Sequence, residues 1–278
     1  AFNISANNGS AIYTIPIRMP DGVKGMQPSV NLTYSSGGVG NGYSGLGWSL
    51  TGISMIKRDG RNNFHNGISS PVNYTGINDV FVLDGDRLMV ISGNNAADGT
   101  VYGKEVEDFS KIQSFGGNGD SPEWFKVTTR DGTIMEYGTE NSKLLTNNSE
   151  NVVIWFLRKI TDPSGNYCKY NYHIDNINRY FYLSSIEYTG NNNTGAQPPY
   201  QIQFSYSLKD DWQNSPVYLS GVSLYSAHIP NKIKVNKSNG EVIRVYDLSY
   251  EYRQKKYFLE AVTESGSNGT KLNPVNFT

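Results

Sequence analysis

Residues 200–207 read Tyr-Gln-Ile-Gln-Phe-Ser-Tyr-Ser. Large apolar or aromatic residues alternate strictly with polar ones, which is the period of a β-strand that buries one face. The same alternation occurs in residues 30–35 (Val-Asn-Leu-Thr-Tyr-Ser), 169–174 (Lys-Tyr-Asn-Tyr-His-Ile) and 246–252 (Tyr-Asp-Leu-Ser-Tyr-Glu-Tyr). These segments predict strands along most of the chain.

Turn sequences divide several strand-like segments into predicted hairpins. Asp84-Gly85-Asp86-Arg87 separates residues 80–83 from 88–91, and Asp131-Gly132 separates residues 124–129 from 133–137. Asp162-Pro163-Ser164-Gly165-Asn166 separates residues 152–160 from 167–174. Asp-Gly and Pro-x-Gly sequences between apolar runs are typical of antiparallel hairpins. Further strands are expected at residues 217–225 and 232–235, whereas residues 58–79 are polar and indicate a long loop.

The composition points the same way. Aromatic residues make up 13% of the 278 residues, with Tyr alone supplying 20, and there are 29 Gly. Aromatic residues favour pleated sheets, and Gly favours turns. We expect an all-β fold of curved antiparallel sheets, sandwich-like or shell-like, with roughly 14 to 16 strands and little helix. This strand content is far above that of an average domain. No Pro-, Ser- or charge-rich linker divides the chain, so residues 1–278 are expected to form a single domain.

Charge and cysteine content narrow the function classes. The net charge is −1, without the basic excess expected of a nucleic-acid-binding protein. No run approaches the roughly 20 apolar residues that a membrane-spanning helix needs, so no direct membrane insertion is expected. A single cysteine, Cys168, allows neither an internal disulfide nor a zinc site of several cysteines.

The residues that usually carry catalysis form no recognisable pattern. The three histidines, His65, His173 and His228, lie far apart in the sequence, and no Gly-x-Ser-x-Gly motif is present. Glu105-Val106-Glu107 matches the Glu-x-Glu pattern of arginine-directed ADP-ribosyltransferases, but the Ser-Thr-Ser strand that accompanies this pattern is absent. Asp84-Gly85-Asp86 offers too few oxygen ligands for calcium. We expect no enzymatic activity, no catalytic or metal-binding residues and no cofactor.

Two short motifs near the N-terminus stand out. They are Gly25-Met26-Gln27-Pro28-Ser29 and Gly45-Leu46-Gly47-Trp48-Ser49-Leu50, the second ending a glycine-rich segment that begins at Gly37. Glycine allows the backbone of one sheet to pass close to another. We interpret Gly25, Gln27, Pro28, Gly45, Gly47 and Trp48 as a structural motif rather than a ligand site, with Trp48 packed between two sheets.

The two motifs together resemble the opening of the SpvB-type N-terminal domain, which occurs in virulence-plasmid toxins, insecticidal Tc-toxin B components and Rhs/YD-repeat proteins. Residues 129–138, the YD-like residues 155–172 and the C-terminal residues 259–278 are similar to later parts of that domain. The resemblance therefore extends over nearly the whole chain.

The resemblance implies a non-catalytic structural module of a secreted or cell-surface bacterial toxin complex. In that family the domain contributes β-sheet wall to a shell that encloses a C-terminal toxin. Its implied partners are downstream domains of the same polypeptide and a pore-forming toxin component, so this chain is expected to be the N-terminal module of a longer protein. The alternative is a surface module that binds carbohydrate, because the chain is rich in Tyr, Trp and Asn and aromatic faces stack on sugars.

Overall fold

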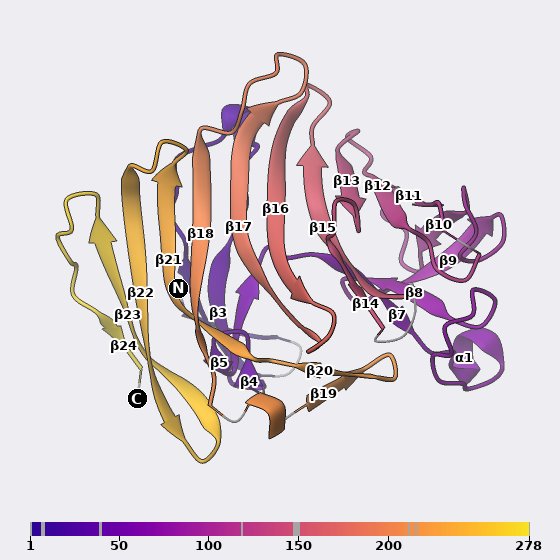
Figure 1. The fold of residues 1–278 in the computed structure, drawn as a ribbon, viewed down its shortest axis with the longest axis horizontal. Helices are drawn as coiled ribbons and strands as arrows, with labels where there is room; N and C mark the ends of the chain where they lie inside the picture. Colours follow the sequence, from indigo (N-terminus) through magenta and orange to yellow (C-terminus); the bar gives the residue numbers. More distant parts are fainter. Residues whose placement is uncertain are drawn as a thin grey trace.

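The computed structural model describes residues 2–6, 9–38, 41–117, 119–146, 151–210, 212–214 and 216–277. These residues form antiparallel strands joined by turns (Figure 1), which confirms the predicted all-β fold. The strands of the described residues run from β1 to β24, more than the 14 to 16 expected. The excess comes from strands of two to four residues, which are too short to show an alternating pattern.

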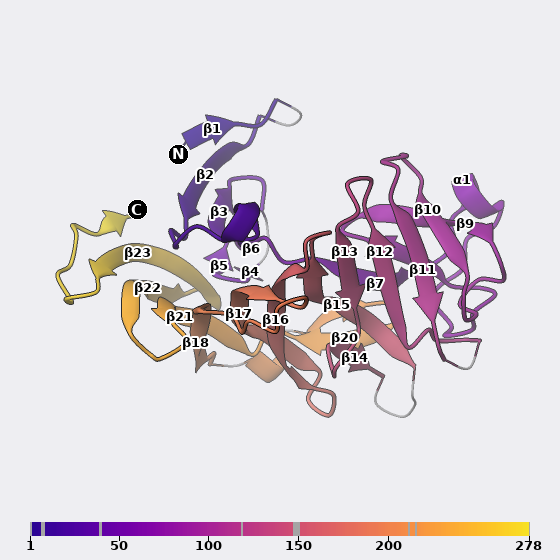
Figure 2. The same ribbon diagram turned by 90° about the horizontal axis from the view of Figure 1, so that it is seen from above.

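Eight strands close into a ring, seen at the right of Figures 1 and 2. Seven of them follow one another in the chain from β7 to β13, and β15 completes the circle by pairing with both β7 and β13. The ring strands are β7 (Met55–Asp59), β8 (Val80–Leu83), β9 (Asp86–Ser92), β10 (Val101–Lys104), β11 (Lys111–Phe115), β12 (Trp124–Thr128), β13 (Ile134–Tyr137) and β15 (Val152–Thr161). The short β14 (Lys143–Leu145) pairs with the first half of β15.

An open, curved sheet continues from the second half of β15. Its long strands alternate between apolar and polar residues, as the sequence predicted, and the apolar face is buried. They are β16 (Asn166–Asp175), β17 (Tyr180–Asn191), β18 (Tyr200–Leu208), β21 (His228–Lys237), β22 (Val242–Arg253), β23 (Lys256–Gly266) and the short β24 (Val275–Asn276).

A four-stranded N-terminal sheet lies across one face of the open sheet (Figure 2). It consists of β1 (Phe2–Ile4), β2 (Ala11–Pro16), β3 (Asn31–Ser35) and β6 (Trp48–Thr51), with the tiny hairpin β4 (Asn41–Gly42) and β5 (Gly45–Leu46) beside it. Leu32 and Trp48 of this sheet share one hydrophobic core with Ile202 and Ile233 of the open sheet. The chain thus forms a two-layer sandwich at one end and a ring at the other.

The remaining elements are short. Residues 217–225 are two strands, β19 (Pro216–Leu219) and β20 (Val222–Tyr225), and not the single strand that we expected. Ser220 and Gly221 have φ values of +53° and +78°, which produce the turn between them. This hairpin packs Leu224 against Phe156 in a second, smaller core. Helical residues are limited to η1 (Val23–Gly25), α1 (Asn63–Asn66) and η2 (Trp212–Asn214), and none of the helices in the described ranges is long and apolar enough to cross a membrane.

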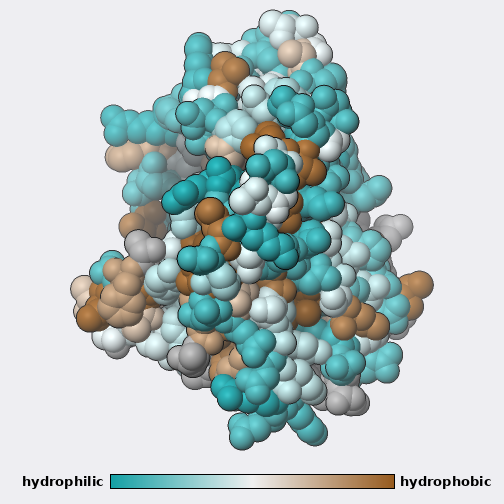
Figure 3. Space-filling view, turned by 90° about the vertical axis from the view of Figure 1, so that its left-hand side faces the viewer, coloured by the Kyte–Doolittle hydropathy of each residue, from teal (hydrophilic) through white to brown (hydrophobic). Residues whose placement is uncertain are grey.

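Several strands of the described residues end their sheets with one edge unpaired, among them β1 and β24. β1 is the outermost strand of the N-terminal sheet, and β24 is the outermost strand of the open sheet. Phe2 and Ile4 of β1 are 67% and 61% exposed. The β24 side of the molecule shows apolar patches among polar side chains (Figure 3).

Candidate functional site

The ionisable groups that could serve catalysis are spread over the fold. His65 bonds through Nε2 to Glu105, 2.8 Å away, on the outer wall of the ring. His173 and His228 instead meet at the open sheet, where both rings contact Tyr182. No group of three or more His, Cys, Asp or Glu side chains that could hold a metal ion occurs among the residues that the structure describes.

Cys168 is unsuited to nucleophilic chemistry. Its side chain is buried in the core, and burial raises the pKa of its thiol to about 12. The thiolate is the reactive and metal-binding form of cysteine. At neutral pH this cysteine therefore behaves as a small apolar core residue.

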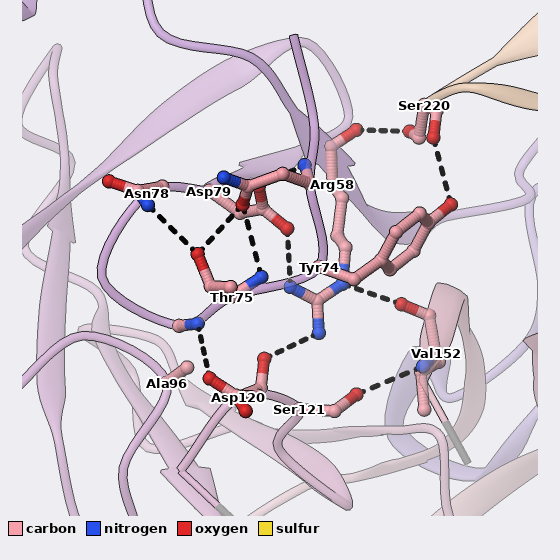
Figure 4. Close-up of polar contacts among 12 residues, drawn as sticks. Arg58, Tyr74, Thr75, Asn78, Asp79, Ala96, Asp120, Ser121, Val152 and Ser220 are labelled. Carbon is pink, nitrogen blue, oxygen red and sulfur yellow. Dashed lines mark hydrogen bonds and ion pairs between the residues drawn. The ribbon is translucent and has the colours of Figure 1, made fainter. Parts of the chain in front are cut away.

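The strongest polar arrangement is an ion pair inside the ring (Figure 4). The Arg58 guanidinium donates from Nη1 to Asp79 Oδ2 at 2.9 Å, and both side chains are completely buried. Arg58 Nε donates to the Val152 carbonyl and Nη2 donates to the Asp120 carbonyl, each at 2.7 Å. A buried charge is stabilised only when its hydrogen-bonding groups find partners, and this guanidinium has partners on three of its sides.

Further hydrogen bonds connect the segment around Arg58 with segments that are distant in the sequence. Ser220 Oγ, at the tip of the β19–β20 hairpin, donates to the Arg58 carbonyl at 2.6 Å, and Tyr74 OH donates to the Ser220 carbonyl at 2.8 Å. Burial lowers the pKa of Arg58 despite the opposing effect of Asp79, and burial raises the pKa of Tyr74 to about 12. We refer to Arg58, Tyr74, Asp79, Asp120 and Ser220 as the Arg58 cluster. Because the Arg58–Asp79 ion pair is enclosed, it joins segments and is not placed to meet a substrate.

Sequence reasoning missed the Arg58 cluster. Asp79 lies at the end of residues 58–79, whose polar composition indicates a long loop. One signal was available: Arg58 follows Ile56 by two residues, so both side chains point to the same side of a strand. A charged residue on the buried side of a strand needs a buried partner.

The first predicted motif begins in a tight turn beside the connection between β15 and β16, where Lys24 Nζ donates to Ser164 Oγ at 2.9 Å. Gly25 has a φ of +77° and lies in the exposed turn η1. Gln27 closes this turn, because its Oε1 accepts a hydrogen bond from the Gly22 amide at 2.6 Å. Pro28 is buried and lines a cleft between this segment and the ring.

The second predicted motif lies at a close crossing of two sheets. A Cβ atom at Gly45 would be 2.6 Å from the Tyr257 carbonyl oxygen of β23, and a Cβ atom at Gly47 would be 2.8 Å from the Tyr34 ring. Trp48 is 4% exposed and contacts the rings of Tyr34 and Phe277. Residues 39 and 40 of the glycine-rich segment lie outside the described residues.

The structure places aromatic side chains together on the open sheet in a way that spacing alone does not predict. The Tyr182 ring lies 4.8 Å from His173, 4.7 Å from His228 and 4.4 Å from Tyr206, measured between ring centroids. Tyr180 adds a further ring, 4.9 Å from His228. We call these five residues the Tyr182 cluster. Its rings are only partly buried, and the Nδ1 atom of His228 is buried without a hydrogen-bond partner in the described part of the chain.

Comparison with known proteins gives one family and several similar folds. Residues 5–217 match the SpvB family, described as Salmonella virulence plasmid 65kDa B protein. The crystal structure of TcdB2-TccC3 is similar with a TM-score of 0.76 and 17% identity, covering 100% of this chain and 16% of that chain. The Photorhabdus luminescens Tc holotoxin pore is similar with a TM-score of 0.74 and 16% identity, and the match covers 97% of this chain and 16% of that chain.

A separately solved domain shows the same fold. The N-terminal domain of effector protein SpvB from Salmonella typhimurium strain LT2 has a TM-score of 0.68 and 18% identity to this chain, covering 91% of this chain and 98% of that domain. No match was found among curated proteins. At these identities the structures establish a shared fold, and this chain spans only 16% of the Tc-toxin chains.

Proposed function

This chain belongs to the SpvB family, as the two N-terminal motifs predicted, and on that premise we propose that it is a non-catalytic structural module of a Tc-like toxin complex. In this proposal residues 1–278 act as one domain that contributes β-sheet wall to a shell around a C-terminal toxin. Its partners are later domains of the same polypeptide and a pore-forming component. The complex is secreted or displayed on the bacterial surface.

One observation carries the proposal: the whole of this chain matches a small part of the TcdB2-TccC3 chain. The same fold also forms nearly all of the solved N-terminal domain of SpvB. A unit that occurs both at one end of an effector and inside a much larger chain behaves as a module that is joined to other domains.

The unpaired edges of β1 and β24 support a wall function. An exposed strand edge presents free N–H and C=O groups that pair readily with another strand. The two chain ends lie on the same side of the molecule (Figures 1 and 2), so neighbouring segments could extend both sheets there. A continuous sheet would separate enclosed cargo from solvent and proteases.

A non-catalytic role is supported by how the described ionisable groups are used. The Arg58–Asp79 pair is enclosed, and Cys168 is buried. His65 is engaged by Glu105, and His173 and His228 pack against Tyr182.

The test is protease protection of the natural full-length protein. If its reading frame continues into Rhs repeats and a C-terminal region, we expect that region to resist trypsin in the intact protein and to be digested once the fold is loosened with urea. Equal digestion in both states would contradict the shell. A hydrolase or a wall anchor in place of the repeats would also contradict it.

A carbohydrate-binding function is the second candidate, and the partly exposed Tyr182 cluster favours it. Aromatic faces at a surface stack on sugar rings. A glycan array tests it with the wild type, Tyr182→Ala and Tyr218→Ala, the last replacing a 75% exposed ring outside the cluster. Binding lost only in Tyr182→Ala would support this function, and an array without signal would exclude it for the glycans tested.

A further inference from the structure

A cleft of about 410 Å³ lies between the ring and the segment that contains the first motif. Its floor consists of apolar side chains that belong to ring strands: Leu83, Val127, Met135, Leu157 and the adjoining Ile160. Gln27, Ser29 and Asp84 lie at its exposed rim. Clefts of about 300–1,000 Å³ with apolar floors and a few polar groups are typical ligand sites.

One wall of the cleft holds a carboxylate in a fixed position. Asp84 accepts hydrogen bonds from Ser54 Oγ at 2.5 Å and from the Met55 amide at 2.9 Å. The Ser54 hydroxyl has only one proton and donates it in the hydrogen bond to Asp84, so Tyr137 OH donates to Ser54 Oγ at 2.9 Å. Tyr137 and Ser54 thus hold Asp84 in place without neutralising it.

The charge of Asp84 has no counter-ion among the described residues. The only cation that lines the cleft, within the part of the chain described, is Lys104. Its ammonium lies 2.7 Å from Asp108 and 3.4 Å from Asp86, so two other carboxylates already share it. The cleft therefore carries a net negative charge at Asp84.

A second polar group faces the same space without a partner. Tyr170 is 2% exposed and lines the cleft, and its hydroxyl makes no hydrogen bond with any described residue. Although the Tyr170 side chain is almost completely buried, its oxygen is not one of the fully enclosed polar atoms that lack a partner, so it is open to the cleft that the residue lines. This hydroxyl is independent of the acidic rim and can form a hydrogen bond with a polar ligand group.

We propose that this cleft binds a guanidinium or primary ammonium group carried on an apolar stem, as in an arginine or lysine side chain of a polypeptide segment. The stem packs on the floor around Met135 and Leu157. The cationic head lies between the Asp84 carboxylate and the Tyr170 hydroxyl, which accepts a hydrogen bond from it. The polar rim residues Gln27 and Ser29 face the backbone of the bound segment. This binding site does not depend on the proposed shell function.

The probe is the peptide acetyl-Ala-Leu-Arg-Ala-amide, titrated calorimetrically into the intact chain. Its matched control replaces Arg with citrulline, which has the same shape without the charge. We expect the arginine peptide to bind at least about tenfold more tightly, since hydrogen bonds to charged groups are the stronger ones. Equal affinity of the two peptides, or no binding of either at millimolar concentration, would overturn the proposal.

Two variants locate the binding. Asp84→Asn keeps an acceptor for Met55 and removes the charge, and Tyr170→Phe removes a hydroxyl that has no internal hydrogen bond. We expect Asp84→Asn to weaken binding about tenfold or more and Tyr170→Phe to weaken it by a smaller factor. Glu241→Gln removes a carboxylate from a remote surface pair with Lys237 and should leave affinity unchanged. Unchanged affinity in both cleft variants would contradict the site, and urea melts of each variant confirm that the fold is retained.

Methionine methyl NMR gives a positional readout. Binding in the cleft should shift the Met135 methyl resonance and leave that of Met89, an exposed residue of β9, in place. The same titration with n-hexylamine distinguishes the two sources of the cation. A free amine that binds as tightly as the arginine peptide would identify a small amine as the ligand rather than a polypeptide.

Discussion

The indole of Trp48 packs edge to face against the ring of Phe277, with 4.8 Å between the ring centroids. One residue belongs to the N-terminal sheet and the other lies directly after β24, at the opposite end of the chain. This contact, together with the Gly45–Tyr257 crossing, fixes the N-terminal sheet to the open sheet.

Replacement of Trp48 by Ala should destabilise the fold by about 3–5 kcal/mol, because it leaves a large cavity between two sheets. Urea unfolding followed by circular dichroism measures the change. Phe64→Ala is the control: Phe64 is 87% exposed, and the expected change is within about 0.5 kcal/mol. A Trp48→Ala midpoint equal to that of the wild type would rule out this packing role.

Gly45→Ala should cost more stability than Gly269→Ala. Both glycines have positive φ, +97° and +78°, so both substitutions strain the backbone by about 1–2 kcal/mol. Only at Gly45 would the new Cβ meet another strand, 2.6 Å from the Tyr257 oxygen, whereas the space around Gly269 is open. Equal unfolding midpoints of the two variants would show that the crossing is not tight.

Asp79→Asn should destabilise the protein by about 3–5 kcal/mol, because it leaves the buried Arg58 charge without its counter-ion. The double variant Arg58→Met/Asp79→Asn should lose less than the sum of the two single variants, which a double-mutant cycle measures. The exposed Lys237–Glu241 pair provides the contrast, with a change of about 1 kcal/mol or less for Glu241→Gln. If the losses in unfolding free energy of the two single variants add up to that of the double variant, the coupling between Arg58 and Asp79 is contradicted.

Stability should decrease as the pH falls below about 6.5, through His228. Burial lowers the pKa of His228 from its ordinary 6.5, and the nearby His173 and Lys209 lower it further. A group whose pKa is lower in the folded protein than in the unfolded chain makes its full contribution to folding stability at a pH above its pKa in the unfolded chain. This contribution is lost as the pH falls through the pKa of the group in the folded protein. The carboxyl groups of Asp108 and Glu140 have pKa values of about 2, so their contributions to folding stability are lost only in more acidic solution.

The control for this pH dependence is His228→Phe, which keeps an aromatic ring against Tyr182 and removes the titration. Urea midpoints between pH 8 and pH 5 should fall more steeply for the wild type than for this variant. Parallel curves for the two proteins would assign the pH dependence to other groups.

The isolated chain should self-associate through the edge of β1. Sedimentation velocity at increasing concentration should show dimers or larger species, since the exposed Phe2 and Ile4 lie on an unpaired strand. Ile4→Lys should reduce the association, because a charge on an edge strand disfavours pairing. A monomer at every concentration would weaken the case for a wall module.

Local structure could be predicted from the sequence because it depends on neighbouring residues. The alternation in residues 200–207 becomes β18, and Asp84-Gly85 becomes the turn of the β8–β9 hairpin, with φ values of +51° and +105°. Such turns need positive φ at both positions, which Asp-Gly supplies.

Long-range pairing could not be predicted in the same way. Nothing in residues 55–59 or 152–161 specifies that β7 and β15 pair and close the ring, because many strands share the same alternation. The partners of Trp48 and Gly45 lie about two hundred residues away, and Asp79 is part of a segment whose polar composition resembles a loop. The glycine-rich motif indicated a close approach, but only the fold shows that Tyr257 and Phe277 are the residues approached.

The closed ring has a consequence for synthesis on the ribosome. All of its strands lie between residues 55 and 161, so it contains mostly local pairings and can form while later residues are still being translated. The N-terminal sheet is made earlier but must wait for β22 and β23, and for Phe277, before its inner face is covered. The N-terminal sheet therefore leaves the ribosome before the rest of this fold but is covered last, and during translation it is the segment on which a chaperone would act.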